Sequence, residues 1–483
     1  MKLQDLIARI PGARLVGDGA VSVHLPRYDS RQVREGDLFC ALRGEKVDGN
    51  QYIETAVKAG AAAVLTAYPS VDPGVPVIHV LNDREAMAHA AHALYGDPTS
   101  RVKIIGVTGT NGKTTTTHII QSIVNATGAR CARIGTIGWE FEGKSEPLAR
   151  TTPEAPDLLA MIAKMADAGA THIAMEVTSI AMPMKRVEGF NWIAGLFTNL
   201  SQDHLDLHGS MDEYFLAKKS FFKELPEPAV AVSNADDPYG DRILQGISAR
   251  CARYSLQGNA DVVGEIIAED HEGLTLNVTC LTGDFEVAAP YVGRFNAENV
   301  LGAIATAVML DIPIQQIQEG VANAPQVRGR MERVALPNGV TAVIDYAHTP
   351  AALERAIVAL RPMTRRKLIV VFGAGGDRDR KKRAVMGKAA VENADLVIVT
   401  SDNPRSEDPQ SIIDQILEGA TGDQVEAIVD RREAIIHALD LAEDGDVVLI
   451  AGKGHETYQE INGVKNHFDD REEVLKAGAE ASC

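Results

Sequence analysis

A glycine-rich turn between an apolar strand and a helix constrains this chain more than any other feature. The apolar run at residues 102–107 predicts a buried parallel strand, and residues 116–124 predict a helix. The connecting segment consists of Gly109, Thr110, Asn111, Gly112, Lys113, Thr114 and Thr115. At such a junction the backbone N–H groups and the helix dipole close around phosphate oxygens. The sequence therefore predicts an α/β domain that binds a nucleotide, with Lys113 at the terminal phosphates and the Thr114 hydroxyl on Mg²⁺.

The spacing of the glycines departs from that of the ordinary phosphate loop. The ordinary loop places its first glycine five positions before the glycine that precedes lysine. Here Gly106 and Gly112 are six positions apart. A purely structural turn does not require Gly-Lys-Thr at the start of a helix. We therefore interpret the segment as a shorter Gly-Thr-Asn-Gly-Lys-Thr variant of the loop, which is typical of a narrower family.

The composition is that of a soluble globular protein of about three domains. Of the 483 residues, 45% are hydrophobic and 24% are charged, and the net charge is −18. This charge disfavours nonspecific binding to nucleic acid or anionic membranes, so local basic clusters must hold any anionic substrate. No apolar run approaches the roughly 20 residues of a membrane span. Residues 1–10 predict an amphipathic helix without the apolar core of a signal peptide.

The cysteines indicate the cellular compartment. The five cysteines are widely spaced and include no CxxC pair: Cys40, Cys131, Cys251, Cys280 and Cys483. An odd number without such spacing argues against a disulfide framework and against a zinc site. We expect a cytoplasmic protein that acts on small molecules and binds neither nucleic acid nor membrane. We expect a monomer, although no sequence pattern here defines the oligomeric state.

Two changes in pattern predict three domains, at residues 1–98, 99–330 and 331–483. The first segment is small and mixed α/β. In the second, residues 173–177, 196–199 and 230–234 predict parallel strands, and residues 260–292 predict an antiparallel appendage. In the third, strands at residues 342–345, 368–372, 396–400 and 447–451 alternate with amphipathic helices. This rhythm predicts a second, Rossmann-like doubly wound sheet.

Polar residues follow the predicted strands, where ligands bind in doubly wound sheets. Glu176 ends one strand, and Asp203 and His204 follow another strand of the same predicted sheet. A carboxylate from one strand end and an imidazole from the next could hold Mg²⁺ beside the nucleotide phosphates. A lone strand-end glutamate is more often a helix cap, and a lone histidine is more often a hydrogen-bonded polar residue. Their position after a phosphate loop favours the metal site.

Other polar residues are ambiguous on spacing alone. The pattern around Lys218 predicts a solvated helix lysine. Asn296 could belong to a turn or a helix cap, and Asp345 could be a cap or an acceptor for a ribose hydroxyl. The segment that contains Asp402 and Arg405 could be a strand-end turn, with Asp402 as a cap and Arg405 in solvent.

A series of short segments runs in order along nearly the whole chain, from about residue 29 to residue 471. It comprises the Gly-Thr-Asn-Gly-Lys-Thr loop and residues 176–177, 198–206, 234–237, 329–332 and 345–350. This series resembles the Mur ligases, which are ATP-dependent amide-forming enzymes of peptidoglycan precursor synthesis. Residues 29–33 and 36–39 are similar to the uridine-nucleotide domain of that family. Residues 402–405 are similar to the motif of members that add meso-diaminopimelate.

The resemblance implies roles for the matching positions. At the ATP phosphates and Mg²⁺ it implies Lys113, Thr114, Glu176, His204 and Lys218, with Lys218 carbamylated by CO₂. At the base, phosphates and ribose of ATP it implies Asn296, Arg330 and Asp345. At the UDP-sugar dipeptide it implies Ser30, Thr151, Thr152, Thr178 and Arg186. At the incoming diaminopimelate it implies Arg378, Asp402, Asn403, Arg405, Gly452 and Glu456.

The resemblance also implies a reaction. ATP would phosphorylate the γ-carboxylate of D-glutamate in UDP-MurNAc-L-Ala-D-Glu, and the amine of meso-diaminopimelate would attack the acyl phosphate. A lysine-adding ligase or a folylpolyglutamate synthetase is the nearest alternative, and Asp29-Ser30-Arg31 and Asp402-Asn403-Pro404-Arg405 argue against both. A regulatory phosphate-loop switch is an alternative of another class, but a switch does not need a second sheet rich in strand-end polar motifs.

Two segments depart from the family pattern. Many relatives have a histidine where this chain has Ile180, so that imidazole is absent or comes from elsewhere in the chain. Some relatives have a His-Gln-Ala segment near the uracil, where this chain has Glu45-Lys46-Val47. The contacts to uracil are therefore left open.

Overall fold

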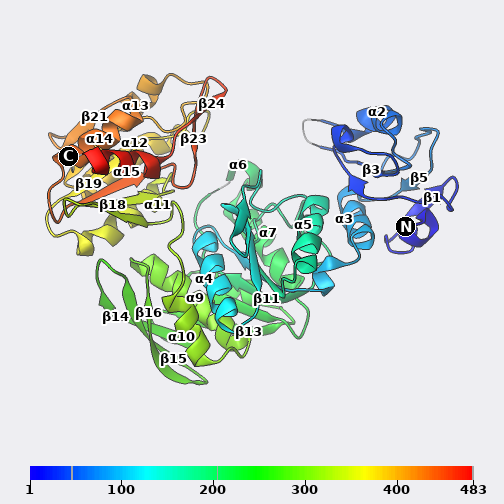
Figure 1. Ribbon diagram of the computed structural model, residues 1–483, viewed down its shortest axis with the longest axis horizontal. Coiled ribbons are helices and arrows are strands. Elements are labelled where there is room, and N and C mark those ends of the chain that lie inside the picture. The colour runs from blue at the N-terminus through cyan, green and yellow to red at the C-terminus, as the bar shows by residue number, and fades with distance from the viewer. Residues whose placement is uncertain (45–46, 204, 481–483) are drawn as a thin grey trace. The chain divides into compact units, whose positions relative to one another are not determined.

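The computed structural model describes residues 1–44, 47–203 and 205–480. The chain divides into two compact units, one comprising Met1–Val262 with Gly302–Gly320, the other Val263–Leu301 with Val321–Cys483. Both units combine helices with parallel-rich sheets, so the predicted α/β class is confirmed (Figure 1). The predicted boundaries near residues 98 and 330 stay predictions. No helix among the described residues is long and apolar enough to cross a membrane.

The first unit begins with a five-stranded sheet of order β1-β5-β4-β3-β2. The strands are β1 (Arg14–Val16), β2 (Pro26–Arg27), β3 (Leu38–Ala41), β4 (Ala63–Thr66) and β5 (Val77–His79), and the helices are α1 (Leu3–Ile7), α2 (Ile53–Lys58) and α3 (Asp83–Leu94). Only β1 is antiparallel to its neighbour. The helix predicted over residues 1–10 is shorter than expected. Pro11 disfavours a helical backbone before it, and Gly12 has a left-handed φ of 67°.

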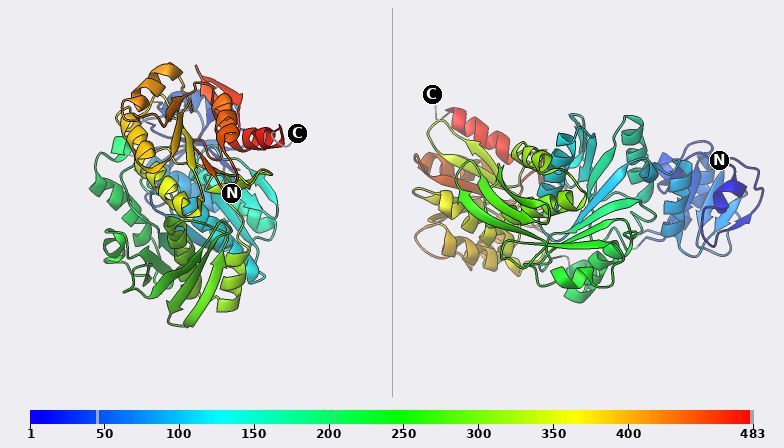
Figure 2. Two further views of the ribbon diagram at one scale, coloured as in Figure 1. Left: turned by 90° about the vertical axis from the view of Figure 1, so that its left-hand side faces the viewer. Right: turned by 90° about the horizontal axis from the view of Figure 1, so that it is seen from below.

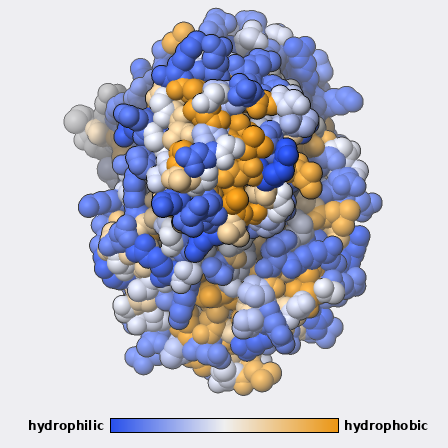
Figure 3. All heavy atoms as spheres, turned by 90° about the vertical axis from the view of Figure 1, so that its right-hand side faces the viewer, coloured by the Kyte–Doolittle hydropathy of each residue, from blue (hydrophilic) through white to orange (hydrophobic). Residues whose placement is uncertain are grey.

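Apolar residues are also present on the surface. Figure 3 shows one face of the molecule, on which hydrophobic residues gather in small patches between hydrophilic ones. Leu81, which follows β5, is 94% exposed. Scattered exposed apolar side chains are normal in folded proteins and do not mark a partner site by themselves.

The second sheet of this unit carries the phosphate loop. Within the unit its strands lie in the order β13-β12-β11-β6-β10-β7-β8-β9. They are β6 (Lys103–Thr108), β7 (Cys131–Gly135), β8 (Gly138–Phe141), β9 (Lys144–Glu146), β10 (His172–Glu176), β11 (Trp192–Phe197), β12 (Val230–Asn234) and β13 (Arg250–Ser255). In the parallel pairs around β6, Glu176 lies opposite Val107 and Phe197 lies opposite Thr108. The three strands therefore end together, at the edge where the phosphate loop begins.

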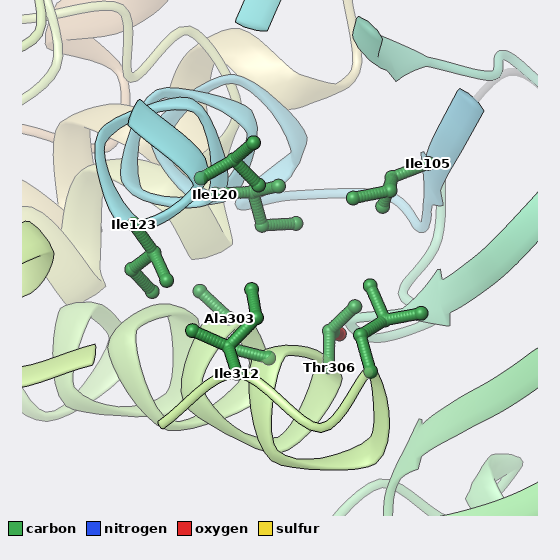
Figure 4. A pocket seen from close by; sticks show the side chains of 9 residues that line it. Ile105, Ile120, Ile123, Ala303, Thr306 and Ile312 are labelled. Atoms are coloured by element: carbon green, nitrogen blue, oxygen red, sulfur yellow. The ribbon is translucent and has the colours of Figure 1, made fainter. Parts of the chain in front are cut away.

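Helices cover both faces of this sheet (Figure 2). On one face pack α5 (Ala155–Asp167) and α7 (Met211–Lys223), and on the other packs α4 (Lys113–Ala126). The remaining helices that begin or end in this unit are α6 (Leu205–His208), α8 (Gly240–Leu244), α9 (Arg294–Met309) and α10 (Ile314–Ala322). A small cavity lies between β6, α4 and α9. The residues that line it include Ile105, Ile120, Ile123, Ala303, Thr306 and Ile312 (Figure 4). Its one polar lining residue, Thr306, donates its hydroxyl to Gly302 O (2.9 Å), so the cavity offers a ligand little beyond apolar contact.

The second unit contains an antiparallel segment. Its strands β14 (Val262–Glu269), β15 (Leu274–Cys280) and β16 (Gly283–Ala289) are neighbours in sequence order, and β15 is antiparallel to β16. The appendage predicted at residues 260–292 is therefore confirmed.

The second unit also contains a six-stranded sheet of order β17-β18-β22-β19-β20-β21. Its strands are β17 (Glu332–Ala335), β18 (Thr341–Asp345), β19 (Leu368–Phe372), β20 (Leu396–Val399), β21 (Val425–Ala427) and β22 (Val447–Ala451), and all pairs except β17–β18 are parallel. One face packs against α11 (Pro350–Leu360), α12 (Lys382–Asn393) and α13 (Pro409–Leu417). The other packs against α14 (Arg431–Leu441) and α15 (Asp470–Glu480), so the predicted doubly wound sheet is confirmed. A hairpin of β23 (Tyr458–Ile461) and β24 (Val464–His467) follows β22.

Candidate active site

The phosphate loop is shaped by its glycines and by the segment that follows β11. Gly112 is the N-cap of α4 with a φ of 85°, and Gly109 has a φ of 149°. A Cβ atom at Gly109 would clash with the Thr198 hydroxyl, so only glycine fits there. The Thr198 hydroxyl donates to Asn111 O (2.6 Å), and Asn111 N donates to the side-chain oxygen of Asn199 (3.0 Å). The protein therefore fixes the loop backbone by itself.

Two lysine side chains meet at the first carbonyl of this loop. Lys113 Nζ donates to Gly109 O (2.9 Å) and to Thr110 O (2.8 Å), and Lys218 Nζ donates to Gly109 O (2.8 Å). Lys218 is only 1% exposed, and its amine lies 4.5 Å from the centroid of the Tyr214 ring. The prediction of a solvated helix lysine is therefore wrong. Burial first, and the charge of Lys113 second, lower the pKa of Lys218 well below its ordinary value.

The side chain of Glu176 lies across the end of the neighbouring strand β7. It is fully buried, and a Cβ atom at Gly135 would clash with it. Thr136 holds both carboxylate oxygens: its backbone N–H donates to Oε1 (2.9 Å) and its hydroxyl donates to Oε2 (2.9 Å). The Thr136 hydroxyl also lies 3.1 Å from the hydroxyl of Thr151. Sequence reasoning missed Thr136, because a threonine between two glycines has the pattern of an ordinary turn.

The residues predicted to hold the UDP-sugar dipeptide come together around Thr152, with one exception. The Thr152 hydroxyl donates to Glu176 O (2.8 Å) and lies 3.3 Å from the Thr178 hydroxyl. Arg186 Nη1 donates to Thr152 O (3.2 Å), and Arg186 Nη2 pairs with Glu154 at 2.9 Å. The exception is Ser30, which lies in the short helix Ser30–Gln32 beside the five-stranded sheet.

Of the other residues predicted at the phosphates and Mg²⁺, the structure describes the two threonines but not the histidine. Thr114 and Thr115 lie in the first turn of α4, and each is 5% exposed. His204 lies outside the described residues, as do Glu45 and Lys46 of the segment considered for uracil.

An imidazole does reach the segment in which Ile180 stands. His208 Nε2, from α6, lies 2.8 Å from the hydroxyl of Ser179. The ring of His208 lies 4.9 Å from that of Tyr214. An imidazole from another element of the same unit therefore stands beside the segment that has isoleucine at position 180.

In the second unit, Arg330 and Asp345 lie together. The Asp345 carboxylate accepts hydrogen bonds from Met331 N and Ala347 N, both at 2.8 Å. Burial raises the pKa of Asp345, and the charge of Arg330 opposes this shift. The Arg330 guanidinium stacks over the Tyr346 ring at 4.6 Å, and its Nε has no hydrogen-bond partner among the described residues.

The side-chain amide of Asn296, unlike Arg330 Nε, has hydrogen-bond partners at both its nitrogen and its oxygen. Its Nδ2 donates to Val292 O (2.8 Å), and its Oδ1 accepts from Asn299 Nδ2 (3.1 Å). It is 2% exposed near the start of α9, so its side chain also stabilises the entry into that helix.

The residues predicted for diaminopimelate lie where β19, β20 and β22 end. Asn403 Nδ2 donates to Glu456 Oε2 (2.7 Å), and Arg405 Nη1 donates to Gly376 O (2.6 Å). A Cβ atom at Gly452 would contact the Asp402 carboxylate, so Asp402 packs directly on this glycine.

The alternative of a solvated strand-end turn at residues 402–405 is wrong in two respects. The N-cap of the following helix α13 is Asp408, not Asp402. The side chain of Arg405 is only 24% exposed, and its Nε lies 3.9 Å from Glu460. Arg378, by contrast, is exposed.

Comparison with known proteins places the chain in a family. The model "Mur ligase family, catalytic domain" matches residues 22–95, "Mur ligase middle domain" matches residues 107–307, and "Mur ligase, glutamate ligase domain" matches residues 329–454. Among curated relatives, proteins of Bacteroides thetaiotaomicron (39% identical, 99% of each chain) and Geobacter metallireducens (42% identical, 100% of this chain and 99% of the relative) are similar over nearly their full length. Both are named UDP-N-acetylmuramoyl-L-alanyl-D-glutamate–2,6-diaminopimelate ligase.

The fold is similar to that of solved structures. A structure of a UDP-N-acetylmuramoyl-L-alanyl-D-glutamate–2,6-diaminopimelate ligase is 34% identical and superposes with a TM-score of 0.74, covering 100% of this chain and 99% of that one. MurF of Thermotoga maritima in complex with ADP has the same fold at 19% identity, with a TM-score of 0.61, covering 95% of this chain and 97% of that one. The relatives and the matching family models together show that the chain belongs to the Mur ligase family.

Proposed function

We propose that this chain is an ATP-dependent ligase that joins meso-diaminopimelate to the γ-carboxylate of D-glutamate in UDP-MurNAc-L-Ala-D-Glu. One observation carries the proposal: relatives named for this activity are 39–43% identical over 93–100% of the chain. The enzyme acts in peptidoglycan precursor synthesis, and we propose that it works as a monomer in the cytoplasm. The lysine-adding alternative has no specific observation in its favour.

The chemistry explains why a phosphate loop is needed. A carboxylate does not acylate an amine at neutral pH, because oxide is a poor leaving group. The γ-phosphoryl group of ATP is transferred to a carboxylate oxygen, which gives an acyl phosphate and ADP. The amine then attacks the carbonyl carbon and loses a proton, and phosphate leaves with the electron pair of the broken C–O bond. Catalysis rests mainly on positioning and on neutralising charge, and we assign Lys113 and the loop N–H groups to that role.

The residues present fit a magnesium site beside the phosphates. Glu176 is a fully buried carboxylate at the end of β10, and Thr136 occupies only part of its hydrogen-bonding capacity. Buried carboxylate oxygens and a threonine hydroxyl are ligands that Mg²⁺ prefers. We assign Thr114, Glu176, His204 and Lys218 to this site. When bound, Mg²⁺ neutralises charge on the phosphates.

We propose that Lys218 is carbamylated. The observation that supports this is its burial beside Lys113, which lowers its pKa and therefore favours the neutral amine. Only a neutral amine attacks CO₂; a new N–C bond forms, and nitrogen loses a proton to leave an anionic carbamate. The modification replaces an amine, which a metal would repel when protonated, with an anion that can bind the metal.

We assign the cluster around Thr152 and Arg186 to the UDP-sugar dipeptide, with Ser30 nearer the uridine. The hydroxyls of Thr152 and Thr178 lie 3.3 Å apart, and the hydroxyl of Thr151 lies 3.1 Å from that of Thr136. Arg186 adds a cation that is 11% exposed. For ATP we assign the unpaired Arg330 Nε and the Asp345 carboxylate, together with Asn296. A buried donor without a partner is costly, and a ligand oxygen would satisfy it.

Replacing Thr136 with valine should lower kcat about 10- to 100-fold, the usual effect of removing a partner that orients a metal ligand. Valine keeps the shape and the backbone N–H but loses the hydroxyl that holds Glu176 Oε2 and contacts Thr151. The Mg²⁺ concentration needed for half-maximal rate should rise in parallel. Thr136→Ser is the matched control and should stay near wild type. Equal rates and metal requirements in the valine variant and the wild type would disprove this role.

Replacing Arg405 with alanine should abolish most activity with diaminopimelate and leave the binding of ATP and the sugar nucleotide nearly unchanged. Meso-diaminopimelate differs from lysine by a distal carboxylate, which a guanidinium pairs through two parallel hydrogen bonds. With lysine bound, Arg405 would be desolvated without that partner, so we expect kcat/KM to favour diaminopimelate by about 10⁴-fold. The control is Arg361→Ala, because Arg361 is exposed and pairs with Asp395. Equal use of lysine by the wild type would show that this assignment is wrong.

The function as a whole is tested by phosphate release. Wild-type protein is mixed with ATP, Mg²⁺ and UDP-MurNAc-L-Ala-D-Glu, and diaminopimelate or lysine is added in separate reactions. We expect phosphate and a tripeptide product with diaminopimelate only. Phosphate release without any amino acid would instead favour a nucleotide switch.

A further inference from the structure

The second unit contains a fully buried lysine that no role above explains. Lys453 follows β22, and its side chain is 0% exposed. Its Nζ donates to Asn403 Oδ1 (3.3 Å), to Glu456 Oε2 (3.5 Å) and to Tyr458 O. Burying an ammonium group is unfavourable unless hydrogen-bond partners and opposite charges compensate it, so the contacts of this lysine call for an explanation.

Two of the three partners of Lys453, Asn403 and Glu456, are residues assigned to the amino-acid substrate. Asn403 Oδ1 also accepts from Glu460 N (2.9 Å), and Asn403 Nδ2 donates to Glu456 Oε2 (2.7 Å). Asn403 is therefore held at both ends of its amide. On Glu456, both contacts use Oε2, and within the described part of the chain Oε1 takes no protein hydrogen bond.

We propose that Lys453 is a positioning residue for the amino-acid substrate: it binds Oδ1 of Asn403 and Oε2 of Glu456 and fixes both side chains, so that Oε1 of Glu456 is available to the ammonium group of the incoming amino acid. This proposal rests on the proposed function, and it adds to it the group that prepares the acceptor. Lys453 itself does not touch the substrate.

The charges around Glu456 explain why a cation is needed. Burial raises the pKa of Glu456, and the nearby Asp402 raises it further, whereas Lys453 and the hydrogen bond from Asn403 lower it. Tyr346, from the segment after β18, and Arg431, from α14, also face this carboxyl electrostatically. Without Lys453 the pKa of Glu456 rises, and below that pKa the neutral carboxyl cannot pair with an ammonium ion.

The test compares two uncharged replacements, Lys453→Met and Lys453→Gln, with the wild type. Methionine approximates the length of the side chain, and glutamine keeps a donor for Asn403 and Tyr458 if methionine fails to fold. We expect KM for diaminopimelate to rise about 10- to 100-fold, the value of a lost charge-assisted hydrogen bond, with KM for ATP and for the sugar nucleotide nearly unchanged. The control is Lys465→Met. Lys465 is exposed, and its amine lies 4.1 Å from the centroid of the Tyr458 ring, the same ring that the amine of Lys453 approaches at 5.5 Å.

The pH profile separates this role from a merely structural one. In either Lys453 variant, the increase in KM for diaminopimelate on lowering the pH should begin at a higher pH than in the wild type, because the pKa of Glu456 is higher without the nearby cation. In a Glu456→Gln background, removing Lys453 should add little further loss, because the two residues act together. Wild-type KM values with a wild-type pH profile in both variants, or an equal rise in KM for all three substrates, would overturn the proposal. A wild type that does not use diaminopimelate would instead overturn the proposed function.

Discussion

Replacing Lys113 with alanine is expected to reduce ligation by at least about 10³-fold while the protein stays folded. We assign to this lysine the positive charge that faces the transferred phosphoryl group, and no other residue of the loop carries one. It stands at the first position of α4 and is half-buried, so its removal leaves no cavity in the apolar core. Product formation from ATP, UDP-MurNAc-L-Ala-D-Glu and diaminopimelate measures the effect, and thermal unfolding checks the fold.

The matched control for Lys113 stands on the same strand–loop–helix unit. Lys103 begins β6 at the opposite end from the loop and is exposed. Lys103→Ala should keep wild-type activity. Near-wild-type product formation by Lys113→Ala would remove the phosphate-loop assignment.

Replacing Lys218 with alanine should leave almost no activity, and small carboxylic acids such as formate or acetate should restore part of it. The reason is the proposed carbamate: a small carboxylate can enter the space left by the side chain and present the same anionic oxygens. Lys219→Ala is the matched control, because the neighbouring Lys219 points to Arg242 O (2.7 Å) instead of the phosphate loop. Its activity should be near wild type and indifferent to added acids.

Isotope-labelled bicarbonate provides an independent readout for Lys218. A labelled carbamate signal should be present in the wild type and in Lys219→Ala, and missing in Lys218→Ala. An unmodified amine in the ATP-bound wild type, or an alanine variant with full activity, would defeat the carbamate proposal.

Local sequence patterns predicted many of the strands of this fold, although the strand predicted at residues 196–199 is β11, which spans Trp192–Phe197. The strand predicted at residues 230–234 is β12 to the residue, and the strands at 368–372 and 447–451 are β19 and β22. Continuous apolar runs that alternate with amphipathic helices are typical of strands in a parallel sheet, which are buried on both faces. The N-terminal helix was predicted too long, because the apolar periodicity continues to Ile10, whereas α1 ends at Ile7.

The site was harder to predict, because its residues become special only through tertiary contacts. Lys218 has the sequence context of a surface lysine, and only the packing of α7 against the phosphate loop buries it. The importance of Thr136 depends on Glu176, 40 residues away, whose side chain crosses β7 at a glycine. Lys453 lies between Gly452 and Glu456, which the resemblance singles out, but its own burial depends on tertiary contacts that the sequence does not show.

The carbonyl of Gly109 accepts from both Lys113 and Lys218, and this has a consequence for nucleotide exchange. Lys113 is already hydrogen-bonded to backbone carbonyls of the loop. We therefore expect nucleotide binding to exchange these hydrogen bonds for hydrogen bonds to phosphate oxygens. The contribution of Lys113 to the binding free energy is the difference between the two sets. ADP has one phosphate fewer and offers Lys113 fewer hydrogen bonds than ATP. The hydrogen bonds from Lys113 to the backbone carbonyls of Gly109 and Thr110 then compete more effectively. We therefore expect the contact that keeps the resting loop ordered to favour the release of ADP.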